Sequence, residues 1–468
     1  MQENLVIHAF LRKFAPQKQN NITMQYYSTN GKAPMADLHK AVVKGLAEDR
    51  GLYMPERIIP LSKTFIDHMS EMSFQDIAYN VADAFFGEDV DGDALQDLVY
   101  DTLQFDCPIV EVKKNIYSLE LFHGPTLAFK DVGARFMARL LQYFIRGEKK
   151  DKEVNVLVAT SGDTGSAVAN GFLGVDGIHV YVLYPKGKVS PIQECQFTTL
   201  GKNITAIEVD GVFDDCQALV KSAFMDAELN QHMMLTSANS INVARFLPQA
   251  FYYFNAVARI KSQNSQAADI VICVPSGNFG NICAALFGHA MGMPVKRFIA
   301  ANNANDIFYN YLQTGQYNPK PSKQTLANAM DVGDPSNFAR IINLYSQNGK
   351  LAPEETHQRI TSLISGATYS DDQIRETMRQ CYKETGYILD PHGACGYRAL
   401  EEQLQPGEIG IFCETAHPAK FKEKVDDILN IDVEIPERLQ AFMKGTKQSV
   451  PMTKNFDDFK QYLLGIQR

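Results

Sequence analysis

The feature that most constrains the fold is an alternation of short apolar runs with helical segments, which begins near Cys107 and continues for most of the chain. Strand–helix alternation at this spacing is typical of a parallel sheet with helices on both faces. The sequence therefore predicts an α/β fold whose functional sites lie beyond the carboxyl ends of the strands. The predicted strands cover residues 116–121, 154–159, 178–184, 204–209, 270–274, 298–301 and 409–413.

The chain before this alternation has a different pattern. Apolar residues recur at helical spacing in residues 38–46 and 74–85, and Gly and Pro interrupt the pattern around residues 51–60. This pattern predicts a mostly helical N-terminal module. After about Pro436 the sequence predicts a helical tail.

Residues 1–23 contain a short apolar run followed by Arg12 and Lys13. The run is interrupted by His8 and lacks a small-residue cleavage site, so it is a poor match to a targeting peptide. We interpret these residues as an extension, or as the result of an alternative start at Met24.

Composition excludes several classes of protein. The chain has 468 residues, 45% hydrophobic and 21% charged, which is close to the globular average and long enough for two or three domains. Its net charge of −9 gives no attraction to nucleic acid or to an anionic membrane. No apolar run reaches the ~20 residues that cross a bilayer. The eight cysteines lack metal-ligand spacing, so we expect free thiols, no metal site and a reducing, cytoplasmic compartment.

The first notable turn follows the predicted strand 154–159. It contains small hydroxylated residues and glycines up to Gly165 and leads into a helix. Backbone N–H groups at that helix start, with the hydroxyls of Ser161 and Thr164, would bind a carboxylate or a phosphate. A simple helix N-cap explains the same residue types.

The second turn follows the predicted strand 270–274 and contains Gly277 and Gly280. Two glycines at this spacing allow the backbone to wrap a phosphate with positive φ angles, and Asn278 and Asn281 offer neutral donors. The turn lacks the ending of a Walker A loop and is not a GxGxxG motif. A single phosphate group is therefore favoured over a triphosphate or a dinucleotide.

The third turn places Lys130 after three apolar residues, 127–129, and before an amphipathic helix predicted over residues 132–145. An ammonium held among apolar groups has a lowered pKa, which gives the neutral, nucleophilic amine that a Schiff base needs. The alternative is a lysine at a helix start that extends its charge into solvent.

Together the three turns suit one cofactor. A reactive lysine, a single-phosphate site and an anion-binding turn, which we expect at strand ends of one sheet, are what pyridoxal 5'-phosphate needs. Lys130 would bind the aldehyde, residues 277–281 the phosphate and residues 161–165 the carboxylate of an amino-acid substrate. For the pyridine nitrogen, the segment after the last predicted strand offers Thr415 or His417.

These segments resemble the threonine synthase family, in its longer form with an N-terminal module, which belongs to the fold-type II pyridoxal-phosphate enzymes. The resemblance covers nearly all of residues 24–420. The segments that carry it are 123–131 around the Schiff-base lysine, 161–165, 277–281, 27–29 with 51–55, 239–242 with Arg245, and 327–337.

The resemblance implies roles for individual residues. Lys130 holds the cofactor and, once substrate has released it, moves protons. Asp163 faces the cofactor's 3' oxygen, where many relatives carry Asn, and would favour its protonated form. Thr415 is our choice for the pyridine nitrogen, and His417 is the alternative, whose other role is helix-start packing. The cofactor contacts are Lys130, Asp163, Gly277, Asn278, Phe279, Gly280, Asn281 and Thr415.

The implied substrate is O-phospho-L-homoserine, which reacts with water to give L-threonine and phosphate. Arg245 is the best candidate for the substrate phosphate, because a guanidinium combines charge with bidentate geometry; a solvent-facing ion pair on a helix over residues 243–260 is the alternative. The implied substrate contacts are Ser161, Thr164, Asn239, Ser240, Asn242 and Arg245. We assign no chemistry to His123, Asp390 or His392, and Asp331 and Asp334 either close over the site or cap a helix.

The resemblance also implies a domain plan. Residues 24–103 form the N-terminal module, 104–135 with 241–468 form a large cofactor-binding domain, and 136–240 form a small α/β domain. We expect the small domain to close on the substrate, and the protein to be a monomer or a homodimer.

Two other functions compete with this one. A lyase or deaminase of a hydroxy or phosphorylated amino acid would use the same lysine and make 2-oxobutyrate, but would not need residues 239–245 or the N-terminal module. A catalytically silent binder of phosphorylated amino acids would have no use for a reactive amine at Lys130.

Overall fold

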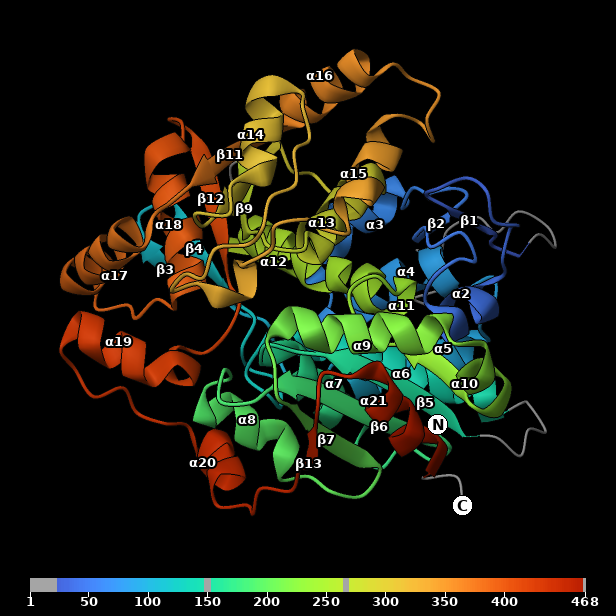
Figure 1. Ribbon diagram of the computed structural model, residues 1–468. Helices are drawn as coiled ribbons and strands as arrows, with labels where there is room; N and C mark the ends of the chain where they lie inside the picture. The colour runs from blue at the N-terminus through green and yellow to red at the C-terminus, as the bar shows by residue number, and fades with distance from the viewer. Residues whose placement is uncertain (1–22, 147–152, 264–268, 466–468) are drawn as a thin grey trace, which may run out of the picture.

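The structure is a computed structural model that describes residues 23–146, 153–263 and 269–465. The extension expected at residues 1–23 lies outside the described residues except for Thr23. Two mainly parallel sheets form the molecule, and the N-terminal module packs beside them (Figure 1).

The first sheet has six strands in the order β11-β10-β9-β12-β4-β3, and all neighbours are parallel except β3 and β4. All seven residues of β12 are buried, because the strand pairs with β9 and β4 and helix α18 (Pro391–Gln403) packs on it. The strands are β3 (Ile109–Lys113), β4 (Ile116–Glu120), β9 (Asp269–Pro275), β10 (Arg297–Asn302), β11 (Ile364–Thr368) and β12 (Glu408–Glu414).

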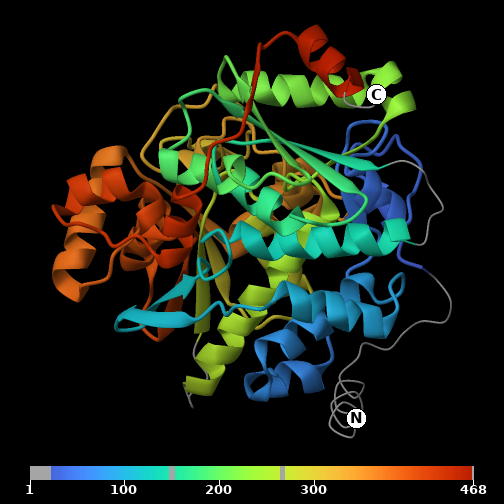
Figure 2. The ribbon, with the colours of Figure 1, turned by 90° about the horizontal axis from the view of Figure 1, so that it is seen from below.

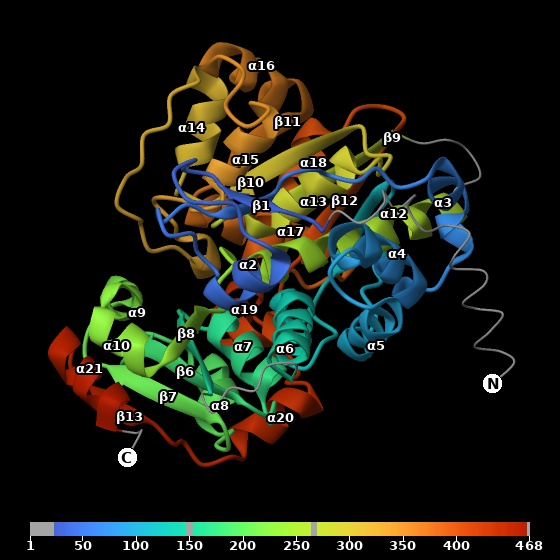
Figure 3. The same ribbon diagram turned by 90° about the vertical axis from the view of Figure 1, so that its right-hand side faces the viewer.

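The second sheet has five parallel strands in the order β13-β7-β6-β5-β8. Figure 3 shows it below the first sheet, with helices α6 and α7 between them. These elements are β5 (Val154–Ala159), β6 (Ile178–Pro185), β7 (Ile204–Val209), β8 (Met234–Ser237), β13 (Val450–Met452), α6 (Lys130–Arg146) and α7 (Asp163–Phe172).

The seven predicted strands are confirmed within two residues at each end. The expectation that the three turns share one sheet is wrong: β4 and β9 belong to the first sheet, whereas β5 pairs with β6 and β8 in the second. Strands of both sheets have the same local apolar pattern, so the sequence does not reveal which strands pair. Four strands of these sheets were not predicted. Strand β3 lies at the edge of its sheet with one buried residue, and β8, β11 and β13 are short or contain Gly or Pro.

The N-terminal module is mainly helical, as expected, with a small antiparallel pair in addition. Its helix α4 packs on α12, and its apolar side chains continue into the core cluster that also contains residues of β9 and β12. Its elements are β1 (Tyr26–Ser28), α2 (Leu38–Lys44), β2 (Tyr53–Pro55), α3 (Lys63–His68), η1 (Met69–Glu71), α4 (Phe74–Phe86) and α5 (Gly92–Thr102).

The helix expected over residues 243–260 is interrupted. A 3-10 turn, η2 (Leu247–Gln249), separates α11 (Val243–Phe246) from α12 (Ala250–Gln263). Pro248 lies in this turn, and proline has no backbone N–H to continue an α-helix.

The expected helical tail contains a strand. Helix α20 (Glu437–Met443) is followed by β13, which pairs with β7, and by α21 (Phe456–Gly465), which packs on α9. This differs from the expectation that residues 241–468 all belong with the first sheet. Figure 2 shows the red C-terminal segment beside the green elements of the second sheet.

The remaining helices complete the two layers. They are α8 (Pro191–Thr198), α9 (Phe213–Met225), α10 (Ala227–His232), α13 (Gly280–Ala290), α14 (Ile307–Thr314), η3 (Asn328–Met330), α15 (Phe338–Tyr345), α16 (Pro353–Leu363), α17 (Asp371–Thr385), η4 (Pro418–Phe421) and α19 (Lys422–Leu429). None of the helices in the described ranges is long and apolar enough to cross a membrane.

Helices α6 and α11 approach so closely that only glycine fits at position 133. A Cβ at Gly133 would lie 2.3 Å from the backbone oxygen of Arg245. This contact sets the distance between Lys130 at the start of α6 and the guanidinium on α11.

We predict that Gly133→Ala destabilises the protein by about 1–3 kcal/mol, although alanine is the better helix former. Thermal unfolding measures the loss. Gly92→Ala is the matched control, because the nearest atom to its Cβ is 3.6 Å away, and it should not lower the melting temperature. A Gly133→Ala protein as stable as the parent would show that the two helices separate without cost.

Candidate active site

Lys130 is the first residue of α6, and backbone hydrogen bonds hold the loop before it. The N–H of Phe129 donates to the oxygen of Thr415 over 2.9 Å, and the N–H of His417 donates to the oxygen of Leu127 over 3.1 Å. The loop after β12 is thus joined to the loop after β4, so Lys130 lies beside residues 415–420.

The surroundings of Lys130 lower its pKa. Burial lowers its pKa; the charge of Asp163 opposes this effect, and the nearby Lys420 and Arg245 add to it. Asp390 also raises the pKa, but by less. The half-buried side chain lies with Nζ 5.0 Å from the centre of its neighbour's phenyl ring, at residue 129. Lys130 is therefore not a lysine with its charge in solvent.

Asp163 begins α7 in the second sheet and is buried beside Lys130. Burial alone would raise its pKa, but the ammonium groups of Lys420 and Lys130 hold that pKa well below its usual range. Lys420 Nζ lies 2.7 Å from Asp163 Oδ1, and Gln193 Nε2 donates to the same oxygen over 2.9 Å. The sequence predicted Asp163 but missed Lys420.

The turn after β5 is organised by a residue that we did not predict. The hydroxyl oxygen of Thr160 accepts hydrogen bonds from the N–H groups of Gly162 (2.9 Å) and Gly165 (2.8 Å). Gly162 is the N-cap of α7, so Ser161 and Thr164 are not capping residues. Their half-buried hydroxyls have no hydrogen bond within the described part of the chain, and both remain available to a ligand.

The turn after β9 uses its glycines differently from the expectation. Positive φ falls on Phe279, at 62°, and not on Gly277 or Gly280. The glycines are needed for space: a Cβ at Gly277 would lie 2.8 Å from the oxygen of Ala329, and one at Gly280 would lie 2.9 Å from Ser240 Cβ. The expectation of positive φ at the two glycines is wrong, because neighbouring chain segments and not the turn angles exclude a side chain.

The amide side chains in this turn already have protein partners. Asn278 Nδ2 donates to Ser240 Oγ over 2.9 Å, and its Oδ1 accepts from the N–H of Ser336 over 2.7 Å. Asn281 Nδ2 donates to the oxygen of Pro275 over 3.0 Å. The two side chains therefore brace the turn.

The backbone of this turn remains open to an anion. Within the described ranges, no hydrogen bond is made by the N–H groups of residues 277–281, and α13 begins at Gly280 without a side-chain cap. Free N–H groups at the start of a helix bind phosphate well. A phosphate here would thus be held by backbone N–H groups.

Thr415 and His417 have different roles. Thr415 is buried, and its hydroxyl has no hydrogen bond within the described segments. His417 is the N-cap of η4: its Nδ1 accepts from the N–H of Ala419 over 3.1 Å, and burial lowers its pKa to about 4. His417 therefore has the helix-start role that we gave as its alternative, which leaves Thr415 for a ring nitrogen.

Arg245 is buried and forms no ion pair with any described residue. It donates through Nη1 to the oxygen of Ala238, and its Nε has no partner within the described part of the chain. Burial lowers its pKa to about 10, so it stays charged at neutral pH. The solvent-facing ion pair that we considered for Arg245 is wrong: its unpaired Nε lies against Gly133 of α6, and its charge acts on Lys130.

The residues before Arg245 divide into two kinds. Asn242 caps α11 by accepting from the N–H of Ala244 (3.0 Å), and it donates to the oxygens of Val42 (2.8 Å) and Ser237 (3.2 Å). Its amide is thus occupied, contrary to its expected contact with substrate. Asn239 has a buried Oδ1 without a partner in the described segments, and so remains available.

Arg340, which the sequence analysis missed, is a second buried cation without a carboxylate partner among the described residues. It donates to Asn337 Oδ1 over 2.6 Å and to the backbone oxygens of Ser240 and Tyr53, each over 3.1 Å. Its guanidinium lies 4.0 Å from the ring centre of Phe246. Burial lowers its pKa to about 9, so it is also charged near neutral pH. No local pattern marks it, because Ser240 and Tyr53 are distant in sequence and only Asn337 is near.

Three residues without assigned chemistry, Asp331, Asp390 and His392, hold the loop 327–337 in place. His392 Nδ1 donates to Asp390 Oδ1 over 2.7 Å, and its Nε2 accepts from the N–H of Ala329 over 3.1 Å. Asp331 accepts from Asn303 over 2.8 Å and from the hydroxyl of Thr325 over 2.7 Å. These contacts keep Ala329 against the turn of Gly277.

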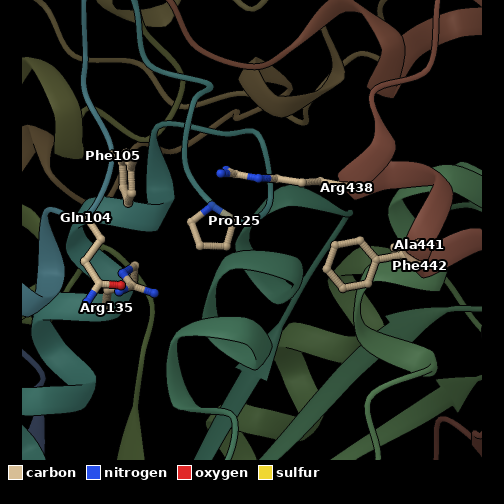
Figure 4. Close-up of a pocket in the computed structure, with 7 residues that line it drawn as sticks. All are labelled: Gln104, Phe105, Pro125, Arg135, Arg438, Ala441 and Phe442. Carbon is tan, nitrogen blue, oxygen red and sulfur yellow. The ribbon is translucent and has the colours of Figure 1, made fainter.

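A pocket of about 400 Å³ lies next to this site but contains none of its predicted residues. Pro125, in the loop before Lys130, lines it, and Arg438 reaches over it from α20 (Figure 4). Arg438 donates to the oxygens of His123 (2.8 Å) and Gly124 (3.1 Å). The pocket is thus bounded by the outer side of the Lys130 loop. Its lining residues are Gln104, Phe105, Pro125, Arg135, Arg438, Ala441 and Phe442.

Three features on two mainly parallel sheets are those of a pyridoxal-phosphate enzyme of fold type II. They are a lysine whose pKa is lowered by burial, a turn with open backbone N–H groups, and two buried arginines without a carboxylate partner in the described part of the chain. The chain matches the family descriptions "Pyridoxal-phosphate dependent enzyme" over residues 103–411, "Threonine synthase N terminus" over 25–103 and "Threonine synthase, C-terminal" over 393–463. The chain belongs to the threonine synthase family, which confirms the resemblance seen in its motifs.

Individual relatives agree with this assignment. A threonine synthase of Serratia marcescens is 43% identical over 443 residues, which cover 95% of this chain and 100% of that protein. The crystal structure of threonine synthase from Escherichia coli has a TM-score of 0.86 and 42% identity, and covers 95% of this chain and 100% of its own. The pyridoxal-phosphate-bound threonine synthase of Brucella melitensis has a TM-score of 0.87 and 33% identity, with the same coverage of both chains.

Glu414, beside the site, is buried and forms no ion pair with any residue that the structure describes. Its Oε1 accepts from the N–H of Asp390, and its Oε2 has no partner in the described segments. Burial, with the charge of Asp390, raises the pKa of Glu414 well above its ordinary 4.5. The folded protein thus holds a proton here that the unfolded chain releases, and stability falls as the pH rises above the unfolded value.

We predict that Glu414→Gln becomes progressively more stable than the parent as the pH rises from about 5 to about 8, by up to about 1.4 kcal/mol per pH unit. Thermal unfolding across this range measures the difference. The exposed Glu434→Gln is the control and should show no such trend. A constant difference between Glu414→Gln and the parent would mean that Glu414 is ionised in the folded protein.

Proposed function

We propose that this chain converts O-phospho-L-homoserine and water into L-threonine and phosphate with pyridoxal phosphate as cofactor. The observation that carries the proposal is the buried guanidinium of Arg245, which has a free Nε and no carboxylate partner among the described residues and which lies beside Lys130. Such a group suits a substrate that carries its own phosphate. Family membership supports the same reaction.

The residues present suit the cofactor. Lys130 would hold it through Nζ, the N–H groups of residues 277–281 would bind its phosphate, Thr415 would face the ring nitrogen and Asp163 the 3' oxygen. When bound, pyridoxal phosphate withdraws electrons from the substrate through its amino group, so that protons on the neighbouring carbons become acidic.

The substrate would lie between the two sheets. Ser161 and Thr164, with the first N–H groups of α7, bind its carboxylate. Arg245 binds its phosphate with help from Asn239 and from the hydroxyl hydrogen of Ser240, whose oxygen already accepts from Asn278. The proposed carboxylate site is on the second sheet, and the proposed phosphate site is formed by residues that follow this sheet's strand β8 in the chain. Each end of the substrate would thus have its own binding site.

Lys130 is the proton carrier in this proposal. Its Nζ would take the proton from the α carbon, give it up, and then take one proton from the β carbon. After phosphate has left from the γ carbon, Nζ would return protons to the γ and α carbons. Water would add its hydroxyl at the β carbon, and its remaining proton would go to the phosphate. A lysine whose pKa is lowered by burial can both accept and donate protons near neutral pH. Closure of the two sheets over the substrate would exclude water until the phosphate has left.

We also propose a domain plan and a location. Residues 24–103 form the N-terminal module, 104–135 and 241–436 the large domain, and 136–240 with the β13–α21 tail the small domain, because β13 pairs with β7. We propose that the protein is a monomer or a homodimer. The eight free cysteines suit a reducing compartment, the cytoplasm.

The test is product analysis with purified protein, pyridoxal phosphate and O-phospho-L-homoserine. We predict equal molar amounts of threonine and phosphate, and no product from Lys130→Ala. Phosphate with 2-oxobutyrate would instead make the protein a lyase, and a bound cofactor without turnover would leave a silent binder.

Arg245 gives a second prediction. Arg245→Met should raise KM for O-phospho-L-homoserine at least about tenfold, since a charge-assisted contact of about 1.4 kcal/mol or more is lost. Steady-state kinetics measure the change. Arg359→Met, which removes an exposed ion pair with Glu355, is the matched control. An unchanged KM in Arg245→Met would place the substrate phosphate elsewhere.

A further inference from the structure

We propose that Lys420 is a positioning residue of this active site: it keeps Asp163 as a carboxylate that faces the site, and it holds the loop of Lys130 against the second sheet. The proposal rests on the proposed function, because it concerns the same site. It adds a residue that no sequence motif identified.

Lys420 lies at a fully buried position, which is unusual for a lysine. It lies in η4, directly after β12, and its side chain is 0% exposed. Lysine is almost never fully buried unless its charge is paired, because a buried ammonium loses its hydration. The position therefore requires strong compensating contacts.

Two contacts compensate this burial, and they lead to different parts of the fold. Lys420 Nζ is 2.7 Å from Asp163 Oδ1, on α7 of the second sheet. The same ammonium donates to the oxygen of Thr126 over 2.8 Å, in the loop that ends at Lys130. One charged group thus joins both sheets at the reactive lysine.

Helix α8 contributes neutral donors to the same two acceptors. Gln193 Nε2 donates to Asp163 Oδ1 over 2.9 Å, and Gln196 Nε2 donates to the oxygen of Thr126 over 3.0 Å. Oδ1 of Asp163 is thereby held by two donors, whereas its Oδ2 has no hydrogen bond to any described residue. The carboxylate is therefore oriented, with one oxygen left for a ligand.

The charges around Lys130 set the direction of the effect. Asp163 and Asp390 favour a proton on nearby groups, and Lys420 and Arg245 oppose it. Asp163 in turn faces Lys420 and Lys130. Removing the positive charge of Lys420 raises the proton affinity of every remaining group, so the site takes up a proton at a higher pH.

The first experiment titrates the visible absorption of the holoenzyme with pH, without substrate. We expect the midpoint in Lys420→Met to rise by at least about one pH unit, a tenfold change in proton affinity, and to remain near the parent value in Lys420→Arg. Lys422→Met is the matched control, because Lys422 pairs with Asp426 away from the site. An unchanged midpoint in Lys420→Met would overturn the proposal.

The second experiment asks whether Lys420 acts through Asp163. We expect kcat to fall at least about tenfold in Lys420→Met and in Asp163→Asn, and the double variant to be no slower than the slower single variant, because residues of one unit are not additive. If the fold-losses in kcat of the two single variants multiply in the double variant, the two residues act independently, and the proposal is overturned.

Melting of the apo-proteins separates folding from positioning. Lys420→Met leaves an unpaired buried carboxylate and should melt lower than the parent, whereas the double variant, with neither charge, should recover most of that loss. If Lys420→Met does not fold, the double variant still decides: a parent-like kcat there would overturn the proposal. Product analysis of the parent tests the reaction independently, since the titration needs no substrate.

Discussion

The ion pair between Lys420 and Asp163 is the interaction on which the site depends, because it connects two sheets that share no strand pairing. The loop after β12 also pairs through its backbone with the loop of Lys130. The reactive lysine is thus held from the first sheet, and the charge that faces it comes from the second. Any movement of one sheet against the other changes the electrostatics at Lys130.

Burial of positive charge without carboxylate partners is the second constraint. Arg245 and Arg340 are both buried, and in the described part of the chain backbone and amide oxygens are their hydrogen-bond partners. Such oxygens satisfy the donors but do not cancel the charge. The region around Ser240 is therefore positive before any ligand arrives, which suits a phosphorylated substrate, and the charge of Arg245 adds to the lowering of the pKa of Lys130.

The turn after β9, where we propose that the cofactor phosphate binds, is braced by its neighbours. Gly277 lies against the backbone of the loop 327–337, and Gly280 lies against Ser240. The side chains of Asn278 and Asn281 stabilise the turn through hydrogen bonds to other protein groups. His392 and Asp390 hold that loop from α18. A ligand would thus meet N–H groups that are already in position, at little further cost in ordering.

The sequence by itself determined the α/β class, seven strands and the positions of the three turns, one of which contains Lys130, because apolar periodicity and turn chemistry are local properties of the chain. Asp163 and Arg245 were singled out only by the resemblance of their segments to a known family. The tertiary structure alone decided that β5 belongs to a second sheet, that β13 joins it, and that Lys420 and Arg340 lie at the site. Strand pairing and the partner of a buried charge depend on contacts between residues far apart in sequence, where no local pattern marks the partner.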